Sequence, residues 1–191
     1  TGGGNFGGVL SGNLSFNRSG TTTTLLTSAQ PYTGATNIRG GILQLRDAGA
    51  LTASSAINNY FGTLNLDFSN LTNFNATDRV ASSVPVNLFG GTVILTGGPG
   101  LLSAESLGTV NVQSGYNTLT STPGTMGTAP LSLNNLTRAT GTVLNFSGTN
   151  LGTAGLGNSS ILIGSLNGTA VSTGTFLGAW LVSGAEFAGY S

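Results

Sequence analysis

The sequence predicts an all-β fold, and the spacing of its strands fits a parallel β-helix (β-solenoid) of roughly six to seven coils. Gly, Ser, Thr and Asn are abundant and sustained helical stripes of apolar residues are missing, which disfavours helices. Short runs of alternating apolar and polar residues recur instead, bounded by Gly or Asn. Each run predicts a strand that turns one face inward.

Six runs show this alternation most clearly. In chain order they are Ile42–Leu45, Thr63–Phe68, Thr92–Thr96, Asn117–Thr120, Thr142–Phe146 and Ile161–Ile163. One core position from each run gives the series Leu43, Leu64, Val93, Leu119, Val143 and Leu162. The steps of this series are 21, 29, 26, 24 and 19 residues, longer than a hairpin and close to one solenoid turn. We expect two or three strands per turn, because shorter strands fit in between at Val84–Leu88, Thr109–Val112 and Leu131–Leu133.

Glycine pairs mark the expected corners of the coils. Stacked coils lie about 4.8 Å apart, so a corner must turn tightly, and glycine tolerates the left-handed backbone that such a turn needs. Gly40-Gly41 and Gly90-Gly91 fit this role. Inward Leu, Val, Ile and Phe would fill the core, while outward Thr and Ser would stack in uncharged ladders.

The chain divides into three parts on this interpretation. We expect residues 1–30 to form the first coil region, residues 31–175 the β-helix coils, and residues 176–191 a terminal coil or cap. A polar segment near 69–83 predicts a loop inserted into one coil. Its polar residues include Asn73, Asn75, Asp78 and Arg79. Aromatic residues that would shield the open face of the last coil are Phe176, Trp180, Phe187 and Tyr190.

An antiparallel sandwich or barrel is the alternative fold. Both architectures also use short alternating strands and glycine-rich turns. The strand pattern alone therefore leaves the choice between parallel coils and antiparallel hairpins open.

One stretch favours the coils through a family resemblance. Residues 32–45, with the sequence YTGATNIRGGILQL, resemble the autotransporter-associated β-strand repeat. In that repeat a Tyr-Thr-Gly-x-Thr turn leads into a strand, a glycine corner and a Gly-x-Leu-x-Leu strand, and here Ile42 stands where Thr is more usual. Segments similar to other parts of such surface proteins are 78–93, 107–120, 136–146 and 178–188. The resemblance implies a right-handed parallel β-helix displayed on a bacterial surface, and it implies no activity.

The residue types needed for most catalysis are missing. His, Cys and Lys are absent, which removes the commonest general base, both thiol chemistries and any amine nucleophile. Zinc sites with His or Cys ligands are excluded for the same reason, and no calcium-binding motif occurs. We expect no enzyme activity, no cofactor and no metal.

Five carboxylates make the best case for an enzyme: Asp47, Asp67, Asp78, Glu105 and Glu186. Polysaccharide hydrolysis needs two carboxyl groups across the scissile bond, and Asp47 and Asp67, 20 residues apart, would lie on adjacent coils. The favoured interpretation is structural, with Asp47 in a turn after Arg46 and Asp67 facing solvent between Leu66 and Phe68.

Threonine and asparagine offer the other candidate surface. The run Thr21–Thr24 and the residues Thr118, Thr120 and Thr122 would face outward, and a flat Thr array can bind ice or a crystalline glycan. Such an array needs Thr at one place on several coils, and Thr63, Thr92, Thr118 and Thr142 only partly meet that need. N-glycosylation sequences begin at Asn13, Asn17, Asn70, Asn75, Asn135, Asn145, Asn158 and Asn167.

The leading hypothesis is a structural segment of an extracellular bacterial surface protein or fibre, whose partners are copies of itself or adjacent repeats. The alternative is an adhesin that binds a glycan or host surface through Thr and Asn ladders, and a polysaccharide-degrading enzyme is less favoured. Nucleic acid is not an expected partner, because the basic residues are five scattered arginines. No membrane span is expected, because no stretch approaches about 18 consecutive apolar residues.

Overall fold

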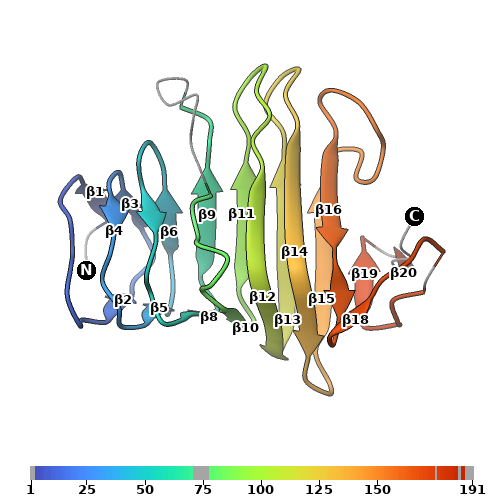
Figure 1. Ribbon diagram of the computed structural model, residues 1–191, viewed down its shortest axis with the longest axis horizontal. Helices are drawn as coiled ribbons and strands as arrows, with labels where there is room; N and C mark the ends of the chain where they lie inside the picture. Colours follow the sequence, from blue (N-terminus) through green and yellow to red (C-terminus); the bar gives the residue numbers. More distant parts are fainter. Residues whose placement is uncertain (1–2, 71–77, 175, 185, 188–191) are drawn as a thin grey trace.

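The structure is a computed structural model that describes residues 3–70, 78–174, 176–184 and 186–187. Every regular element within these residues is a strand. The strands form two nine-stranded sheets, sheet A and sheet B, and a two-stranded sheet C (Figure 1). The predicted all-β class is confirmed.

Both large sheets run the length of the molecule. Across sheet A the strands are β1 (Gly4–Phe6), β3 (Thr23–Leu26), β6 (Ile42–Leu45), β9 (Thr63–Asp67), β11 (Thr92–Thr96), β13 (Tyr116–Thr122), β15 (Val143–Gly148), β19 (Leu181–Ser183) and β20 (Glu186–Phe187). Across sheet B they are β2 (Phe16–Arg18), β5 (Thr36–Ile38), β8 (Ile57–Tyr60), β10 (Val86–Phe89), β12 (Glu105–Ser114), β14 (Ala129–Arg138), β17 (Ser165–Leu166) and β18 (Thr169–Ala170), with β16 (Ser159–Ile163) also paired to β14. Sheet C holds β4 (Ala29–Gln30) and β7 (Ala50–Leu51).

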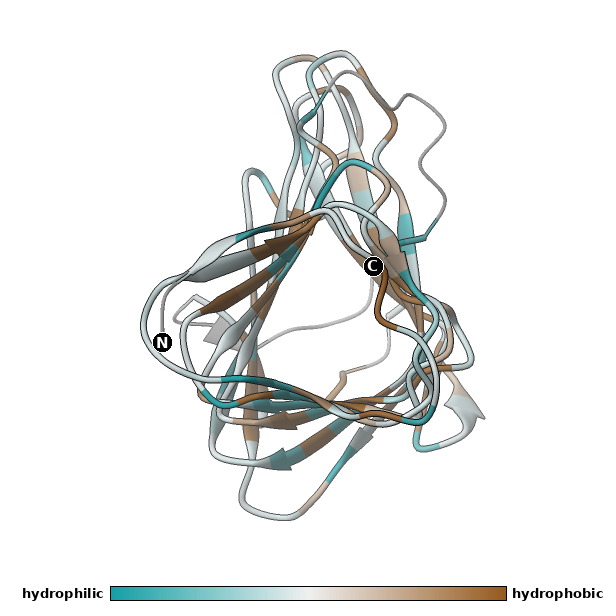
Figure 2. Ribbon diagram, turned by 90° about the vertical axis from the view of Figure 1, so that its left-hand side faces the viewer, coloured by the Kyte–Doolittle hydropathy of each residue, from teal (hydrophilic) through white to brown (hydrophobic). Residues whose placement is uncertain are grey.

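The chain passes alternately through the two large sheets. Apart from the short strands β18 and β20, each new strand pairs in parallel with a strand from an earlier pass, as β6 does with β9 and β9 with β11. Viewed along its length, the chain encloses a roughly triangular section (Figure 2). Parallel neighbours rule out a fold made of consecutive hairpins, and the arrangement is compatible with a β-solenoid.

The register between paired strands of sheet A confirms most of the predicted core series. Leu43 pairs with Leu64, Leu64 with Val93, and Val93 with Leu119. The last two positions of the series are wrong. Leu119 pairs with Phe146, three residues beyond the expected Val143, because the corner 139–142 between β14 and β15 is longer than the single Gly115 between β12 and β13. Leu162 lies in β16 of sheet B and not in sheet A, because a loop after β15 lengthens the last coil and β15 next pairs with β19.

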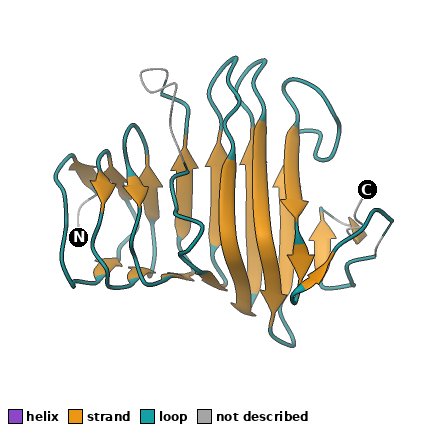
Figure 3. Cartoon of the chain, in the orientation of Figure 1, coloured by secondary structure: helices purple, strands orange, loops and turns teal. Residues whose placement is uncertain are grey.

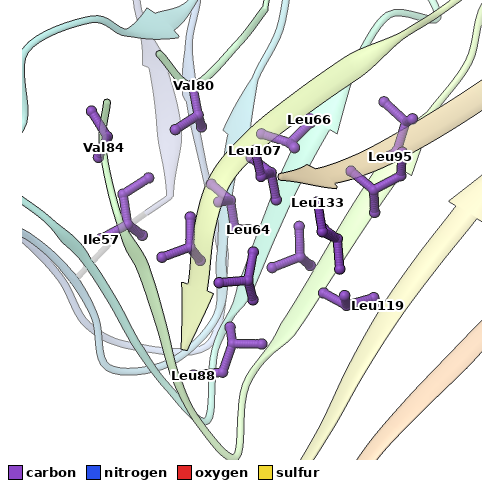
Figure 4. Packing of buried hydrophobic residues seen from close by; sticks show 14 of the residues in the cluster. Ile57, Leu64, Leu66, Val80, Val84, Leu88, Leu95, Leu107, Leu119 and Leu133 are labelled. Carbon is purple, nitrogen blue, oxygen red and sulfur yellow. The ribbon is translucent and has the colours of Figure 1, made fainter. Parts of the chain in front are cut away.

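A single apolar core fills the space between the sheets. Alternate residues of each strand point into it, so that Leu64 and Leu66 of β9 lie opposite Ile57 of β8 and Leu88 of β10 (Figure 4). All four side chains are fully buried. Burial of one such side chain stabilises the folded state by about 1.5–3 kcal/mol. Similar burial recurs along the whole core.

Glycine forms the corners between sheet B and sheet A, as predicted. Gly41 has a φ of 60° and Gly90 a φ of 85°, in the left-handed region. The backbone groups that these tight turns leave unpaired are satisfied by buried polar side chains. Asn117 Oδ1 accepts hydrogen bonds from the amides of Gly90 and Gly91 at 2.8 and 3.1 Å, and Asn59 Nδ2 donates to the Thr92 carbonyl at 2.9 Å.

The Tyr-Thr-Gly-x-Thr motif has a structural role in the turn before β5. The fully buried Tyr32 hydroxyl lies 2.6 Å from Thr36 Oγ1, which lies 2.9 Å from Ser54 Oγ on the next coil. Burial raises the pKa of the Tyr32 phenol to about 12, although its hydrogen bond with Thr36 acts in the opposite direction. Gly34 has no room for a side chain, because a Cβ there would overlap the Leu14 carbonyl.

The two ends of the sheets differ. At the amino end the outermost strands, β1 and β2, belong to the parallel series. At the carboxyl end the outermost strands are antiparallel: β18 pairs with β17, and β20 with β19. Of the expected terminal aromatic shield, Trp180 packs partly buried against the core, Phe176 is exposed, and Tyr190 lies outside the described residues.

Loops join the long strands of the later coils on one side of the molecule (Figure 3). The expected inserted loop near 69–83 includes Asn73 and Asn75, which lie outside the described residues. Arg79 and Val80, which follow, are buried, and Val80 bridges to Leu51 of sheet C. No helix long and apolar enough to span a membrane occurs among the described residues.

Candidate functional site

A continuous row of asparagines runs along the outer face of sheet B. The asparagine ladder consists of Asn17, Asn37, Asn58, Asn87 and Asn111, one from each of five successive strands. Each Nδ2 donates to the Oδ1 of the asparagine before it, at 2.8–2.9 Å. At its carboxyl end the row is completed by Thr137, whose hydroxyl donates to Asn111 Oδ1.

The alternation of each strand places the ladder outside. Asn58 lies between the buried Ile57 and Asn59, and Asn87 between the buried Val86 and Leu88. The ladder asparagines are separated by 20, 21, 29 and 24 residues. The sequence predicts outward ladders but did not single out this one, although asparagines that recur at the strand spacing were a signal for it.

An aromatic stack lies beside the ladder, formed by the residues two positions after Asn58 in β8 and Asn87 in β10. The rings of Tyr60 and Phe89 stack with centroids 4.6 Å apart and planes inclined by 16°. The guanidinium of Arg39 covers the Tyr60 ring at 4.9 Å. Phe61, in the next corner, exposes 79% of its surface. This face therefore combines amides, one cation and aromatic carbon, the groups with which proteins bind polar, uncharged ligands.

The threonine row on sheet A is shorter than a repeating array would be. Thr63, Thr92 and Thr118 pair in register and face outward, as predicted. The prediction that Thr142 belongs to this row is wrong. Thr142 is buried, and its hydroxyl donates a hydrogen bond to the Ala139 carbonyl at 2.9 Å. The next position in the row is occupied by Asn145, which pairs with Thr118. The run Thr21–Thr24 supplies only Thr23, which pairs with Ile42 at the start of the same row.

The two carboxylates of the enzyme hypothesis both have structural partners. Asp47 lies in the turn after β6, as predicted, with a φ of 57°, and its carboxylate is 3.6 Å from Arg46 Nε. The expectation that Asp67 faces solvent is wrong, since only 4% of it is exposed. Gln44 Nε2 donates to one Asp67 carboxylate oxygen at 2.5 Å, and the Ser69 amide to the other at 2.8 Å. These bonds hold both oxygens of Asp67 at the end of β9.

Arg79 ties the ends of β6 and β9 together from inside the molecule. Its guanidinium donates to the backbone carbonyls of Asp47, Gly49 and Asp67 and lies 4.5 Å from the centre of the Phe68 ring. Arg79 is only 3% exposed, and this burial lowers the pKa of its guanidinium, while nearby carboxylates act in the opposite direction.

The buried position of Glu105 has a large effect on the pKa of its carboxyl group. Its carboxylate lies in β12, is 1% exposed and accepts hydrogen bonds from the backbone amides of Arg79 at 2.7 Å and Val80 at 2.9 Å. Burial raises the pKa of Glu105 to about 8, although these two donors lower it. The side chain thereby anchors the backbone of Arg79 and Val80 to β12.

Other predicted positions are dispersed over the surface. Among the N-glycosylation sequences, Asn13, Asn17 and Asn167 are exposed, and Asn75 lies outside the described residues. Within the described part of the chain, no group of three or more His, Cys, Asp or Glu side chains could hold a metal ion. No protein-family model, no curated protein and no solved structure matches the chain.

The asparagine ladder predicts a position-dependent loss of stability. Asn58→Ala removes two ladder hydrogen bonds and should lower the free energy of unfolding by about 1–2 kcal/mol. Asn17→Ala, at the exposed end, removes one bond and should cost at most about 1 kcal/mol. Urea unfolding of the two variants and the parent checks this order, and equal losses would contradict the predicted dependence on position.

Glu105 predicts a pH dependence of stability. The folded state holds the Glu105 proton more tightly than the unfolded chain, whose pKa is near 4.5, because the folded pKa is about 8. The contribution of Glu105 to the free energy of unfolding is therefore fully present below pH 4.5 and is lost as pH rises toward 8. Thermal unfolding from pH 4 to 9 should show this decline, and Glu105→Gln should flatten it. An unchanged slope in the variant contradicts the assignment.

Proposed function

We propose that the chain is a non-catalytic structural segment of an extracellular bacterial surface protein or fibre, a right-handed parallel β-helix of six to seven coils. The observation that carries this proposal is the unbroken pairing of successive coils on sheets A and B, reinforced outside by the asparagine ladder. Such pairing gives a rod its length and stiffness.

Several properties support the proposal. Parallel strands joined by crossovers within one sheet are right-handed in nearly all proteins, which favours the right-handed sense. The resemblance of residues 32–45 to the autotransporter-associated repeat supports surface display. Only 5% of the residues are charged and the formal net charge is zero, so electrostatic repulsion between copies is weak.

The amino end of the rod is the favoured site of association. The edges of β1 and β2 can accept a further parallel coil, from a second copy or from an adjacent repeat. Asn5 and Asn17 lie in the middle of these edge strands. At the other end, β18 and β20 have two residues each and run antiparallel, and short edge strands resist pairing.

Self-association can be tested by placing charge on one edge. The parent should form dimers or filaments at high concentration, seen by light scattering and electron microscopy. Asn5→Lys combined with Asn17→Lys should keep the protein monomeric, because an edge lysine opposes strand pairing. Thr169→Lys, on the exposed strand β18, is the matched control and should associate like the parent. A parent that stays monomeric at every concentration refutes this part of the proposal.

An adhesin is the second candidate, favoured by the asparagine ladder and the adjacent stack of Arg39, Tyr60 and Phe89. Amides and aromatic rings are suited to the hydroxyls and C–H faces of a neutral glycan. No corresponding observation favours a polysaccharide-degrading enzyme, since Asp67 is buried and both its oxygens are bonded.

Glycan binding by this face predicts a local effect of mutation. On a glycan array, Tyr60→Ala should lower binding of a recognised glycan about tenfold, the scale of one lost aromatic contact. Leu162→Ala, at an exposed residue of β16, should leave binding unchanged. If the parent binds no glycan on the array, the adhesin candidate is removed and the structural role is unaffected.

A further inference from the structure

Three exposed aliphatic side chains lie on three neighbouring loops. Leu102 is in the loop 97–104 between β11 and β12, Met126 in the loop 123–128 between β13 and β14, and Leu156 in the loop 149–158 between β15 and β16. They expose 73%, 68% and 66% of their surfaces. We call this set the aliphatic crest. Large apolar side chains gathered on a protruding surface usually mark an interaction site.

Backbone hydrogen bonds hold the three loops side by side. The Gly100 amide donates to the Thr125 carbonyl at 2.8 Å, and the Thr128 amide to the Leu101 carbonyl at 2.9 Å. The Gly157 amide donates to the Gly127 carbonyl at 2.7 Å, which brings the third loop to the second. These bonds involve the residues next to Leu102, Met126 and Leu156. The backbone pairing of the sheets therefore continues into the loops and fixes the crest residues side by side. The loops project from one side of the molecule (Figures 1 and 2).

The crest carries no charge. None of the residues 97–104, 122–128 and 149–158 is Asp, Glu, Lys or Arg. Much of the loop backbone is already paired: besides the bonds above, the amides of Ser103 and Gly127 donate to the carbonyls of Thr128 and Gly124 at 2.8 and 2.9 Å. Paired amides and uncharged side chains lower the cost of entering an apolar phase.

We propose that the aliphatic crest inserts into the interfacial layer of a lipid membrane, as a shallow, reversible anchor for the rod. A fluid lipid surface closes around protruding tips and needs no matching groove. A protein partner is less suited, because three side chains supply far less than the roughly 800 Å² per partner that stable protein interfaces bury. The absence of basic residues from the loops favours zwitterionic lipid over recognition of anionic headgroups. This inference is independent of the structural role proposed above.

Vesicle flotation tests the proposal. The full chain should float with phosphatidylcholine vesicles, and adding phosphatidylserine or salt should change its partitioning by less than about twofold. The triple variant Leu102→Ser, Met126→Ser, Leu156→Ser should partition at least about tenfold less. Phe61→Ser is the matched control: Phe61 is more exposed than any crest residue but precedes the start of β9, whereas the crest loops follow the ends of β11, β13 and β15, and its loss should have no effect.

A gain-of-function variant keeps the test decisive if the triple variant does not fold. Met126→Trp should strengthen partitioning several-fold, because Trp favours the membrane interface. The proposal is overturned if the parent does not float, or if Met126→Trp and the triple variant both partition like the parent. It is also overturned if the crest substitutions change only the oligomeric state in light scattering, which would assign the crest to contacts between copies.

Discussion

The register between parallel strands is the constraint on which the rest of this structure depends. Once Leu64 pairs with Leu43 and Val93, the residues on either side of them in the strand must face outward. A slip of one residue would exchange the core for the surface along a whole strand. On sheet B the asparagine ladder enforces the register from outside, because its hydrogen bonds form only when successive asparagines lie directly opposite one another. Core and surface thus specify one alignment.

The sequence determined the middle of the molecule better than its ends. The strands Ile42–Leu45 and Thr92–Thr96 were predicted with their observed bounds, because alternation is strict there and glycine marks each corner. The error at Val143 arose where the corner has no glycine pair and Thr142 mimics an outward threonine while bonding inside the turn. Leu162 was misassigned because a long loop moved the next apolar run into the other sheet. Loop length cannot be read from alternation.

The candidate site shows a similar division. Outward polar ladders followed from composition and alternation, yet locating the asparagine ladder required the coil lengths, which vary from 20 to 29 residues along it. The burial of Asp67, Arg79 and Glu105 could not be predicted, because charged residues are usually exposed and nothing local marks these as exceptions. Their partners are mainly backbone groups of distant coils. Only the folded geometry shows that these side chains hold the end of β9 and the backbone of Arg79 and Val80 in place.

The loops between the strands separate what holds the molecule together from what it presents to its surroundings. Coils of unequal length share one register, so residues can be added beyond the end of a strand without disturbing the layers above and below. The backbone bonds between the loops 97–104, 123–128 and 149–158 extend the order of the coils into these additions. Natural variation, or grafting of foreign peptides, can therefore act on this side of the protein, at positions whose spacing is set by the sheets.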